Sequence, residues 1–469
     1  MKHYNLIILG NGAAAFAAAI KASEINDKIS ILMIGKGSLG GTCVNVGCIP
    51  SKYLLELSHK YYYPKHKRLE GIIFNDIKLD FSKVMNSLRG LVNNLREEKY
   101  YKVLSNYPNV EYIEGKGYFT SSNELIIENG DKFNVSADNI IIATGSSPSI
   151  PPIEGLDSID YLTSNTIWQI NELPESIAII GGGAIGLEIG QALLHFGSKV
   201  SIIEALDRIA YQAEPEISDA LQNILEREGM EFHLRSRVAK INKVNSKVEI
   251  EVMSKEGRKK ISANKLLLAT GRKANTKGLM LDKAGIDTEN GSIKVNSRLQ
   301  TTNPRVYAAG DVIAKDLMLE TLAAREGAIA AMNILGYDKR IDYNTIPWAI
   351  FTHPNVAGIG MSEYEVMSKY GACSCRILSL DVVPKAQLLN EEGLAKMIIH
   401  PKDKRILGMQ VLAPYASEFI TEVAIAMRNN LTFEDMIDIT HVFPTISESI
   451  KLTAQTFVRD VRKMSCCLE

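Results

Sequence analysis

The stretch NLIILGNGAAA (residues 5–15) has a counterpart of the same form, SIAIIGGGAIG (residues 176–186), and this pair decides the fold. Each begins with an apolar run that predicts a buried parallel strand, and each continues through a glycine-rich turn into a helix of small residues. Such glycines permit a tight turn and a close backbone approach, so that the helix N-terminus faces a pyrophosphate. The sequence therefore predicts two Rossmann-like dinucleotide-binding units, with turn residues Gly10, Gly12, Ala15, Gly181, Gly183 and Gly186.

Each half also contains an apolar strand that ends in ATG, at residues 140–145 and 266–271. These strands indicate a return of the chain from an inserted unit, and we place Thr144, Gly145 and Gly271 at the nucleotide sites. From about residue 343, strands alternate with amphipathic helices such as SEFITEVAIAMRNN and SESIKLTAQTFVRDVRKM, which is typical of an α+β unit. Two dinucleotide sites in one chain imply one bound flavin and one nicotinamide. The prediction is an α/β protein divided into a FAD-binding domain (1–150), an NAD(P)-binding domain (151–271), a central part that completes the FAD domain (272–342) and a C-terminal domain (343–469).

Composition excludes several classes of function. A chain of 469 residues that is 46% hydrophobic can bury several cores. Its 53 basic and 54 acidic side chains nearly balance, which argues against nucleic acid or an anionic membrane as partner. Apolar runs stay short of the roughly 18 residues that a membrane span needs, and no cleavage-site pattern follows the first strand, so we expect a cytoplasmic protein. In that compartment, six cysteines indicate catalysis or metal binding rather than structural disulfides.

Four of the cysteines form two pairs. GGTCVNVGCIPSK (residues 40–52) contains Cys43 and Cys48, and the chain ends with Cys466 and Cys467 before Leu-Glu. Pro50 suits the first turn of a helix, which places Cys48 near the helix N-terminus, where a thiolate is favoured. Adjacent cysteines can close only a strained ring, so the second pair is a poor staple and a better clamp for a soft metal or arm for thiol exchange. Together the pairs indicate that something is passed between thiols.

The first pair carries a family resemblance. GGTCxNxGCxPSK is the redox motif of flavin-dependent pyridine nucleotide disulfide oxidoreductases, and TNPRVYAAGD (residues 302–311) is similar to the second FAD motif of that family. The resemblance covers nearly the whole chain and implies bound FAD and NAD(P)H, a glutathione-reductase-like fold and a C-terminal dimerisation domain. It implies a homodimer with active sites shared between subunits. It also implies roles for individual residues: Cys48 as flavin-proximal thiol, Cys43 as interchange thiol, Lys52 near the flavin and paired with Glu188, and Gly41, Thr42 and Asp311 at the FAD.

The C-terminal part resembles one subgroup, the mercuric reductases. Disulfide reductases of the family carry His-Pro-Thr there, and the His acts as general acid/base to the interchange thiol. In this chain Phe443 holds that position, and Phe cannot transfer a proton. The residues from Lys451 to the Cys-Cys end, and VPKA (residues 383–386), resemble mercuric reductases. Hg(II) prefers two thiolates and needs no proton shuttle. The resemblance implies that the partner subunit's Cys466 and Cys467 capture Hg(II) from small thiols and pass it to Cys43 and Cys48, where it is reduced.

Several positions depart from the expected pattern. Thr445 stands where the subgroup often has Tyr, and His441 is either a slipped acid/base or a packing residue. Gly35 ends the second strand, where an acid for the ribose is expected, so that contact is predicted to be lost although FAD is still expected. Because the chain starts at its first strand, we expect no N-terminal mercury-binding module.

Two further positions bear on ligands. Glu204 ends the matching strand of the second unit, where a carboxylate binds the ribose 2′-OH and repels a 2′-phosphate. This favours NADH over NADPH, whereas Arg208 keeps NADPH open. Cys373 and Cys375 share one face of a predicted strand, as a metal site or as ordinary thiols.

Three functions stay open at this point. The prediction is a homodimeric enzyme that reduces Hg(II) with NAD(P)H. A dithiol reductase of the lipoamide or thioredoxin-reductase type is the nearest alternative, and Phe443 counts against it. A thiol-based metal-binding protein with vestigial nucleotide sites is the third, and the intact Lys52, Glu188 and Asp311 count against that.

Overall fold

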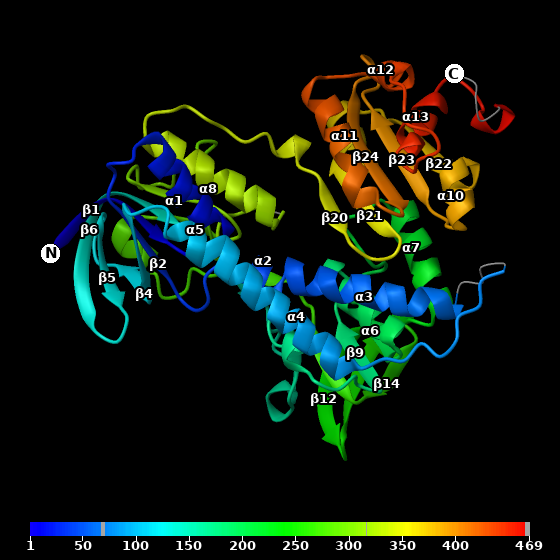
Figure 1. Ribbon diagram of the computed structural model, residues 1–469, viewed down its shortest axis with the longest axis horizontal. Helices are drawn as coiled ribbons and strands as arrows, with labels where there is room; N and C mark the ends of the chain where they lie inside the picture. The colour runs from blue at the N-terminus through cyan, green and yellow to red at the C-terminus, as the bar shows by residue number, and fades with distance from the viewer. Residues whose placement is uncertain (67–70, 316, 465–469) are drawn as a thin grey trace.

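The computed structural model describes residues 1–66, 71–315 and 317–464, so the predicted tail thiols Cys466 and Cys467 lie outside the described residues. Three lobes are visible in Figure 1, and each is built around a main sheet of five or more strands. The N-terminal lobe lies at the left, the second unit below, and the C-terminal part at the upper right. Helices α3 and α4 run across the centre and join the lobes.

The first lobe is built on a seven-stranded sheet with the order β3-β2-β1-β6-β5-β4, and β19 pairs with the end of β6. Leu9 at the end of β1 pairs with both Ile34 and Ile142, so the carboxyl ends of three parallel strands meet at one edge. Ligands bind at such an edge. The strands are β1 (Lys2–Leu9), β2 (Ile31–Gly35), β3 (Val110–Glu114), β4 (Lys116–Phe119), β5 (Glu124–Glu128), β6 (Lys132–Ile142) and β19 (Val306–Ala308).

Helices α1 (Ala13–Ile25) and α8 (Glu320–Ile334) pack closely against each other beside this sheet. Their contact requires a glycine, because a Cβ added at Gly327 would lie 2.0 Å from the carbonyl oxygen of Ala14. The small residues of α1 therefore serve helix packing as well as the nucleotide turn.

The second lobe repeats the arrangement with a parallel sheet of order β11-β10-β9-β15-β8. Its strands are β8 (Leu162–Thr163), β9 (Ser176–Ile180), β10 (Lys199–Ile203), β11 (Glu231–His233) and β15 (Lys265–Leu268), and its helices are α6 (Ala184–Phe196) and α7 (Pro215–Glu228). An antiparallel sheet joins it, made of β12 (Arg237–Val244), β13 (Lys247–Ser254) and β14 (Gly257–Ala263). This is the inserted unit from which the second ATG strand returns.

The third lobe is an antiparallel sheet of order β20-β21-β24-β23-β22 with helices beside it. The strands are β20 (Trp348–Ile350), β21 (Asn355–Gly360), β22 (Ser374–Ser379), β23 (Leu394–Ile399) and β24 (Ile406–Ala413). The helices are α9 (Glu363–Tyr370), α10 (Pro384–Leu389), α11 (Ala416–Arg428), α12 (Phe433–Asp438) and α13 (Glu448–Gln455).

One predicted helix is shorter than expected. The amphipathic pattern over residues 447–464 predicts a single helix, but α13 ends at Gln455. Hydroxyl groups compete with the helical ladder there, since Thr456 donates to the carbonyl of Thr453 at 2.6 Å. Asp460 then caps a separate 3₁₀ turn by accepting from the backbone N–H of Arg462. The pattern identified the apolar face but not the break within it.

The remaining elements connect the lobes. They are α2 (Gly41–Val46), α3 (Cys48–His66), α4 (Phe81–Arg96), α5 (Lys102–Leu104) and the two-stranded ribbons β7 (Ser146–Pro148) with β16 (Arg272–Ala274) and β17 (Thr288–Glu289) with β18 (Ser292–Ile293). Leu54 and Leu55 of α3 are buried in one cluster with Leu187 of α6, so the redox helix is fixed against the second lobe.

The predicted α/β class, with two Rossmann-type sheets and a separate C-terminal α+β unit, is confirmed. In the described part of the chain, no helix combines the length and apolar character that crossing a bilayer requires.

Candidate active site

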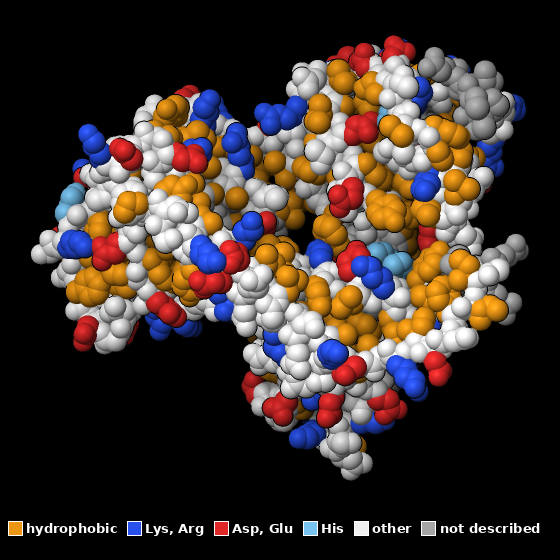
Figure 2. Space-filling model, viewed as in Figure 1, with side chains coloured by type: hydrophobic (Ala, Val, Ile, Leu, Met, Phe, Trp, Pro, Cys, Tyr) orange, Lys and Arg blue, Asp and Glu red, His pale blue; other side chains and the backbone are white. Residues whose placement is uncertain are grey.

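A cavity of about 640 Å³ lies where the three lobes meet. Figure 2 shows the surface hollowed between the lobes, with basic and acidic side chains intermixed around it. Residues of all three lobes line the cavity, and eight predicted site residues are among them, seven of which are Gly12, Thr42, Cys43, Cys48, Lys52, Gly145 and Asp311. The eighth is Glu188. The cavity thus joins the first nucleotide turn to the cysteine pair.

Cys43 and Cys48 form a hydrogen-bonded pair at the junction of α2 and α3. Cys48 is the first residue of α3 and Cys43 lies in the preceding helix. A hydrogen bond from Cys43 lowers the pKa of Cys48, and the nearby charge of Lys52 lowers it further. The same hydrogen bond, together with burial, raises the pKa of Cys43. One thiol of the pair is therefore favoured as thiolate and the other as its proton donor.

Lys52 and Glu188 form an ion pair in the lining of the cavity. Lys52 Nζ donates to Glu188 Oε2 at 2.7 Å, and Glu188 is only 4% exposed. The other carboxylate oxygen accepts the backbone N–H of Phe351 at 3.0 Å, and Lys52 Nζ lies 4.4 Å from the Phe351 ring centre. Phe351, which follows β20, was missed from the sequence because an isolated Phe carries no motif. Phe351 therefore contacts both members of the ion pair, Glu188 through its backbone N–H and Lys52 through its ring.

Asp311 belongs to a second network that includes Arg272. Ser146 Oγ donates to Asp311 Oδ2 at 2.7 Å, and Arg272 Nε donates to Ser146 Oγ at 2.7 Å. Arg272 also contacts Thr42 Oγ1 at 3.4 Å. Sequence reasoning missed Arg272, although it directly follows the second ATG and a signal was available there. The network joins both ATG segments to the cavity.

The first glycine turn provides an open cradle for a nucleotide. A Cβ at Gly10 would lie 2.1 Å from the carbonyl oxygen of Ala143, and one at Gly41 would lie 2.6 Å from Gly12 Cα. Gly12 is the N-cap of α1, and glycine has no side chain to occupy the N–H groups of the first turn. A pyrophosphate fits those donors, so these residues and Asp311 suit FAD. Ala15 is fully buried on α1 and supports the turn by packing.

The departure at Gly35 has a structural explanation. A Cβ at Gly35 would lie 2.3 Å from Cβ and 2.5 Å from Cγ of Asn11. The Asn11 side chain fills that space, and its Nδ2 donates to the carbonyls of Gly37 at 2.9 Å and Ser38 at 3.2 Å. The glycine at the end of β2 therefore accompanies the asparagine in the turn.

In the second glycine turn, the polar side chain comes from Glu204, which directly follows β10. Glu204 accepts the backbone N–H of Gly182 at 2.7 Å and that of Leu206 at 2.8 Å. Gly183 is the N-cap of α6, and a Cβ at Gly186 would lie 2.1 Å from the carbonyl oxygen of Gly181. The guanidinium of Arg208, by contrast, lies 4.1 Å from the Tyr211 ring centre and donates to the Tyr211 carbonyl at 3.2 Å.

Thr144 and Gly271 of the two ATG segments do not line the cavity; they stabilise the segments that connect the first and second lobes. Thr144 Oγ1 donates to the carbonyl of Asn275 at 2.9 Å, and Asn275 returns a bond to the carbonyl of Thr144. Gly271 has a positive φ of 89° beside the ribbon of β7 and β16. Thr144 and Gly271 therefore support Gly145 and Arg272, which line the cavity.

The C-terminal residues that departed from the pattern lie away from the cavity lining of the same chain. Phe443 is 49% exposed, and Thr445 donates to the carbonyl of Val442 at 2.7 Å. His441 Nε2 lies 2.7 Å from Glu422 Oε1, and this hydrogen bond raises the pKa of His441. The hydrogen-bonded pair of His441 and Glu422 thus lies close in sequence to Phe443, with His441 two residues before it.

Comparisons with known proteins show the family of this chain. Residues 4–327 match the family described as pyridine nucleotide-disulphide oxidoreductase, and residues 346–454 match its dimerisation domain. The mercuric reductase of Streptomyces lividans is 38% identical over 471 residues, which cover 99% of this chain and 98% of that relative. The mercuric reductase of Staphylococcus aureus is 36% identical over 470 residues, covering 99% and 84%.

A solved structure is similar over the same length. It is the Cu(II) complex of the HOCl-induced flavoprotein disulfide reductase RclA from Escherichia coli, with a TM-score of 0.86 and 27% identity. The similarity covers 98% of this chain and 100% of that chain.

The predicted family resemblance and the C-terminal dimerisation domain are confirmed by these matches, and the domain supports a homodimer. The family uses FAD and a pyridine nucleotide, which the two glycine turns accommodate. An oxidoreductase with a redox cysteine motif, two nucleotide turns and this full-length similarity belongs to the pyridine nucleotide-disulphide oxidoreductase family.

Proposed function

We propose that this protein is a homodimeric mercury(II) reductase, which uses NAD(P)H and FAD to reduce thiol-bound Hg(II) to Hg(0). The observation that carries the proposal is Phe443, an exposed apolar ring at the position where disulfide reductases of the family need a proton donor. Splitting an organic disulfide requires protonation of a leaving thiolate. Reduction of Hg(II) does not, because the metal itself accepts both electrons.

The cysteine pair suits Hg(II) as substrate. Hg(II) is a soft ion that binds thiolates, and the lowered pKa of Cys48 supplies one thiolate without an added base. Hg(II) bound to Cys48 then displaces the proton of Cys43 and is held between both sulfurs. The overall reaction balances as NAD(P)H + Hg(SR)₂ → NAD(P)⁺ + Hg(0) + RS⁻ + RSH, with two electrons transferred.

The surrounding residues orient and shield this reaction. When bound, FAD supplies the two-electron relay between nicotinamide and the cysteine pair. Lys52, fixed by Glu188 and by the Phe351 ring, places one positive charge beside the Cys48 thiolate. Gly10, Gly12, Gly41, Thr42, Gly145 and Asp311 would hold the FAD, and Gly181, Gly183, Gly186 and Glu204 the nicotinamide nucleotide. Cys466 and Cys467 of the tail remain the proposed entry port for Hg(II).

The proposal includes a preference for NADH. Both carboxylate oxygens of Glu204 accept a backbone N–H, yet each oxygen keeps a lone pair for a ribose hydroxyl. A 2′-phosphate would meet the same negative charge. Since Arg208 is engaged with Tyr211, its guanidinium is turned to a neighbour in its own loop.

A disulfide reductase is the second candidate, and one observation favours it. His441 pairs with Glu422, and this hydrogen bond raises the pKa of His441, which favours its proton-carrying form. The similarity to the flavoprotein disulfide reductase RclA points the same way. In that case His441 would act as the general acid/base in place of the histidine that Phe443 replaces.

One assay separates the candidates. Anaerobic NAD(P)H oxidation is measured with Hg(II) in excess small thiol, and in parallel with lipoamide and with oxidised thioredoxin. We expect oxidation that depends on Hg(II) and releases volatile Hg(0). Oxidation that depends on a dithiol substrate and not on mercury would refute the proposal.

Two variants sharpen the assay. His441→Gln should leave Hg(II)-dependent turnover within about twofold of the wild type, whereas a disulfide reductase that relies on His441 should lose about 10²–10⁴-fold. Cys466→Ala with Cys467→Ala should lower turnover of thiol-chelated Hg(II) and leave flavin reduction by the nicotinamide intact. Unchanged turnover would rule out the entry port.

A further inference from the structure

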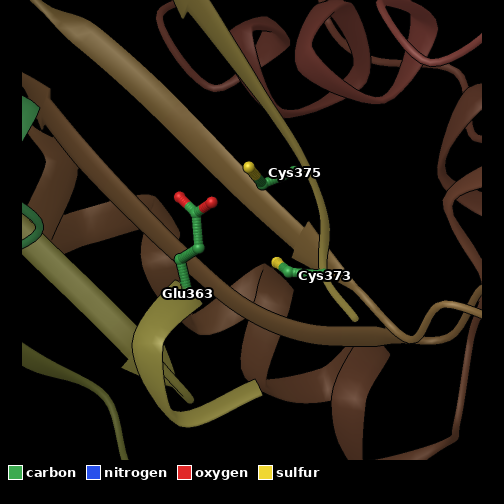
Figure 3. Close-up of side chains that lie close together, drawn as sticks. All are labelled: Glu363, Cys373 and Cys375. Carbon is green, nitrogen blue, oxygen red and sulfur yellow. The ribbon is translucent and has the colours of Figure 1, made fainter. Parts of the chain in front are cut away.

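A second group of thiols lies in the third lobe, outside the cavity. Cys373 directly precedes β22, Cys375 lies on β22, and Glu363 is the first residue of α9. One sulfur from each cysteine and one oxygen from Glu363 all lie within 4.8 Å of one another. Figure 3 shows the Glu363 carboxylate directed from its helix toward the strand that carries the two thiols. Two soft donors and one hard donor thus share one small space.

Both sides of this group are held in place by the fold. Ser362 and Glu365 form a capping box at the start of α9, and the backbone N–H of Glu363 donates to Glu214 Oε1 at 2.8 Å. On the other side, Cys375 is paired with Ile398 in the antiparallel ladder of β22 and β23. The donors are therefore brought together by two rigid elements, which is what a preformed metal site needs.

The surrounding charge favours a cation. Lys396 is 1% exposed and its Nζ contacts the carboxylates of Glu363 at 2.7 Å, Glu214 at 2.8 Å and Glu216 at 3.0 Å. Three carboxylates around one ammonium leave a net negative charge next to the thiols. Lys396 Nζ contacts Oε2 of Glu363, and each carboxylate oxygen has more than one lone pair with which to bind a further cation.

We propose that Cys373, Cys375 and Glu363 bind one thiophilic divalent cation of the Zn²⁺ or Cd²⁺ type, separate from the catalytic cysteines. A tetrahedral Zn²⁺ with Zn–S bonds of about 2.3 Å and Zn–O bonds of about 2.1 Å holds its ligand atoms roughly 3.5–3.8 Å apart. The three donors need to close by only about 1 Å to reach that geometry. A water molecule supplies the fourth position.

Binding is an exchange of protons for metal. Two Cys–SH groups and M²⁺ give M(S–Cys)₂ and two H⁺, with no change of oxidation state. Burial and the hydrogen bond to Glu363 raise the pKa of Cys375 to about 12, and burial raises the pKa of Cys373. Because each thiol gives up its proton on binding, the site favours ions with strong affinity for sulfur.

Cd²⁺ titration of the full-length holoenzyme tests the proposal. The probe is the thiolate-to-metal charge-transfer absorbance, and the stoichiometry is checked by mass spectrometry under native conditions. Cys373→Ser with Cys375→Ser should bind one equivalent of Cd²⁺ fewer per chain than the wild type. Glu363→Gln keeps both thiols and should bind the same number of equivalents with an affinity reduced about tenfold.

Ser374→Ala is the matched control, since it changes the residue between the two cysteines and removes no proposed ligand. Its Cd²⁺ stoichiometry and affinity should equal those of the wild type, and flavin content and NAD(P)H oxidation should be unchanged in all variants. If the double serine variant binds as many equivalents as the wild type, or if Ser374→Ala weakens binding as much as Glu363→Gln, the site does not exist.

Discussion

The two glycine turns of this chain have the same backbone and opposite side-chain arrangements. In the first, Gly10 donates to the carbonyl of Ile34 at 2.7 Å, and in the second Gly181 donates to that of Ile203 at 2.9 Å. A Cβ at either glycine would lie 2.1 or 2.3 Å from the carbonyl oxygen of the neighbouring ATG strand. These contacts make residues 11 and 182 equivalent, and residues 35 and 204 equivalent.

The polar side chain comes from different elements in the two turns. The first has asparagine in the turn and glycine at the end of β2, and the second has glycine in the turn and glutamate directly after β10. Asn11 donates to two loop carbonyls, whereas Glu204 accepts two backbone N–H groups. The same space is filled in both cases, but by groups of opposite hydrogen-bonding character.

This difference changes the meaning of Gly35. Considered alone, Gly35 indicates that the nucleotide-binding motif has lost the acid that binds the ribose. As half of a pair, it is the glycine that the Asn11 side chain requires, because a larger residue would overlap Asn11. Two positions twenty or more residues apart therefore behave as one unit in each turn.

The largest effect is expected from the feature that the turns share. Gly10→Ala and Gly181→Ala each place a Cβ against a backbone oxygen, at φ values of 144° and 113°. Backbone strain and overpacking each cost about 1–3 kcal/mol. Gly10→Ala should lose flavin, and Gly181→Ala should keep flavin but fail to accept electrons from the nicotinamide. The flavin-to-protein ratio and anaerobic flavin reduction measure the two outcomes.

Gly90→Ala is the control for a general cost of alanine. Gly90 lies inside α4, and among the described residues a Cβ there meets open space. This variant should be stabilised by up to about 1 kcal/mol and keep both activities. The equivalence of the turns would be broken if both turn variants lost the same function.

A smaller effect should follow from exchanging the pair in the first turn. Gly35→Glu alone overlaps Asn11 and should lower the free energy of unfolding by about 1–3 kcal/mol. Asn11→Gly with Gly35→Glu recreates the second turn and should recover most of that loss. A double-mutant cycle from thermal denaturation should give a coupling energy of about 0.5–3 kcal/mol.

Additive single effects would contradict the reciprocal arrangement. The holoenzyme also reports on function, because the double variant supplies a carboxylate for the ribose. We expect its FAD to dissociate no faster than that of the wild type. Faster FAD loss together with normal stability would show that Asn11 contributes to the nucleotide site itself.

Sequence reasoning found what depends on local pattern. Apolar runs and glycines predicted β1 and β9. The two glycine turns were located because their backbone conformation demands glycine whatever the surroundings. The motif around Cys43 and Cys48 marked the redox pair for the same reason, since both cysteines and their glycine lie within one short segment.

What depends on distant contacts could not be predicted. Asn11 and Gly35 come together only through the register of β1 and β2, and Phe351 meets Glu188 across two lobes. The end of α13 at Gln455 depends on hydroxyl competition that the apolar period does not report. The roles of the site residues, the domain boundaries and the tail stay predictions.

The smallest effect is expected at Glu204, where a substitution tests whether the second glycine turn differs from the first in its contact with the nucleotide. Glu204→Gln leaves one acceptor oxygen, so one N–H of Gly182 or Leu206 faces an amide N–H instead. If the carboxylate also reads the ribose, the ratio of kcat/KM for NADH over NADPH should fall about tenfold, equivalent to about 1.4 kcal/mol. Steady-state kinetics with both nucleotides measures it. An unchanged ratio, or a wild type that prefers NADPH tenfold or more, would mean that Glu204 only holds the turn, as Asn11 does in the first.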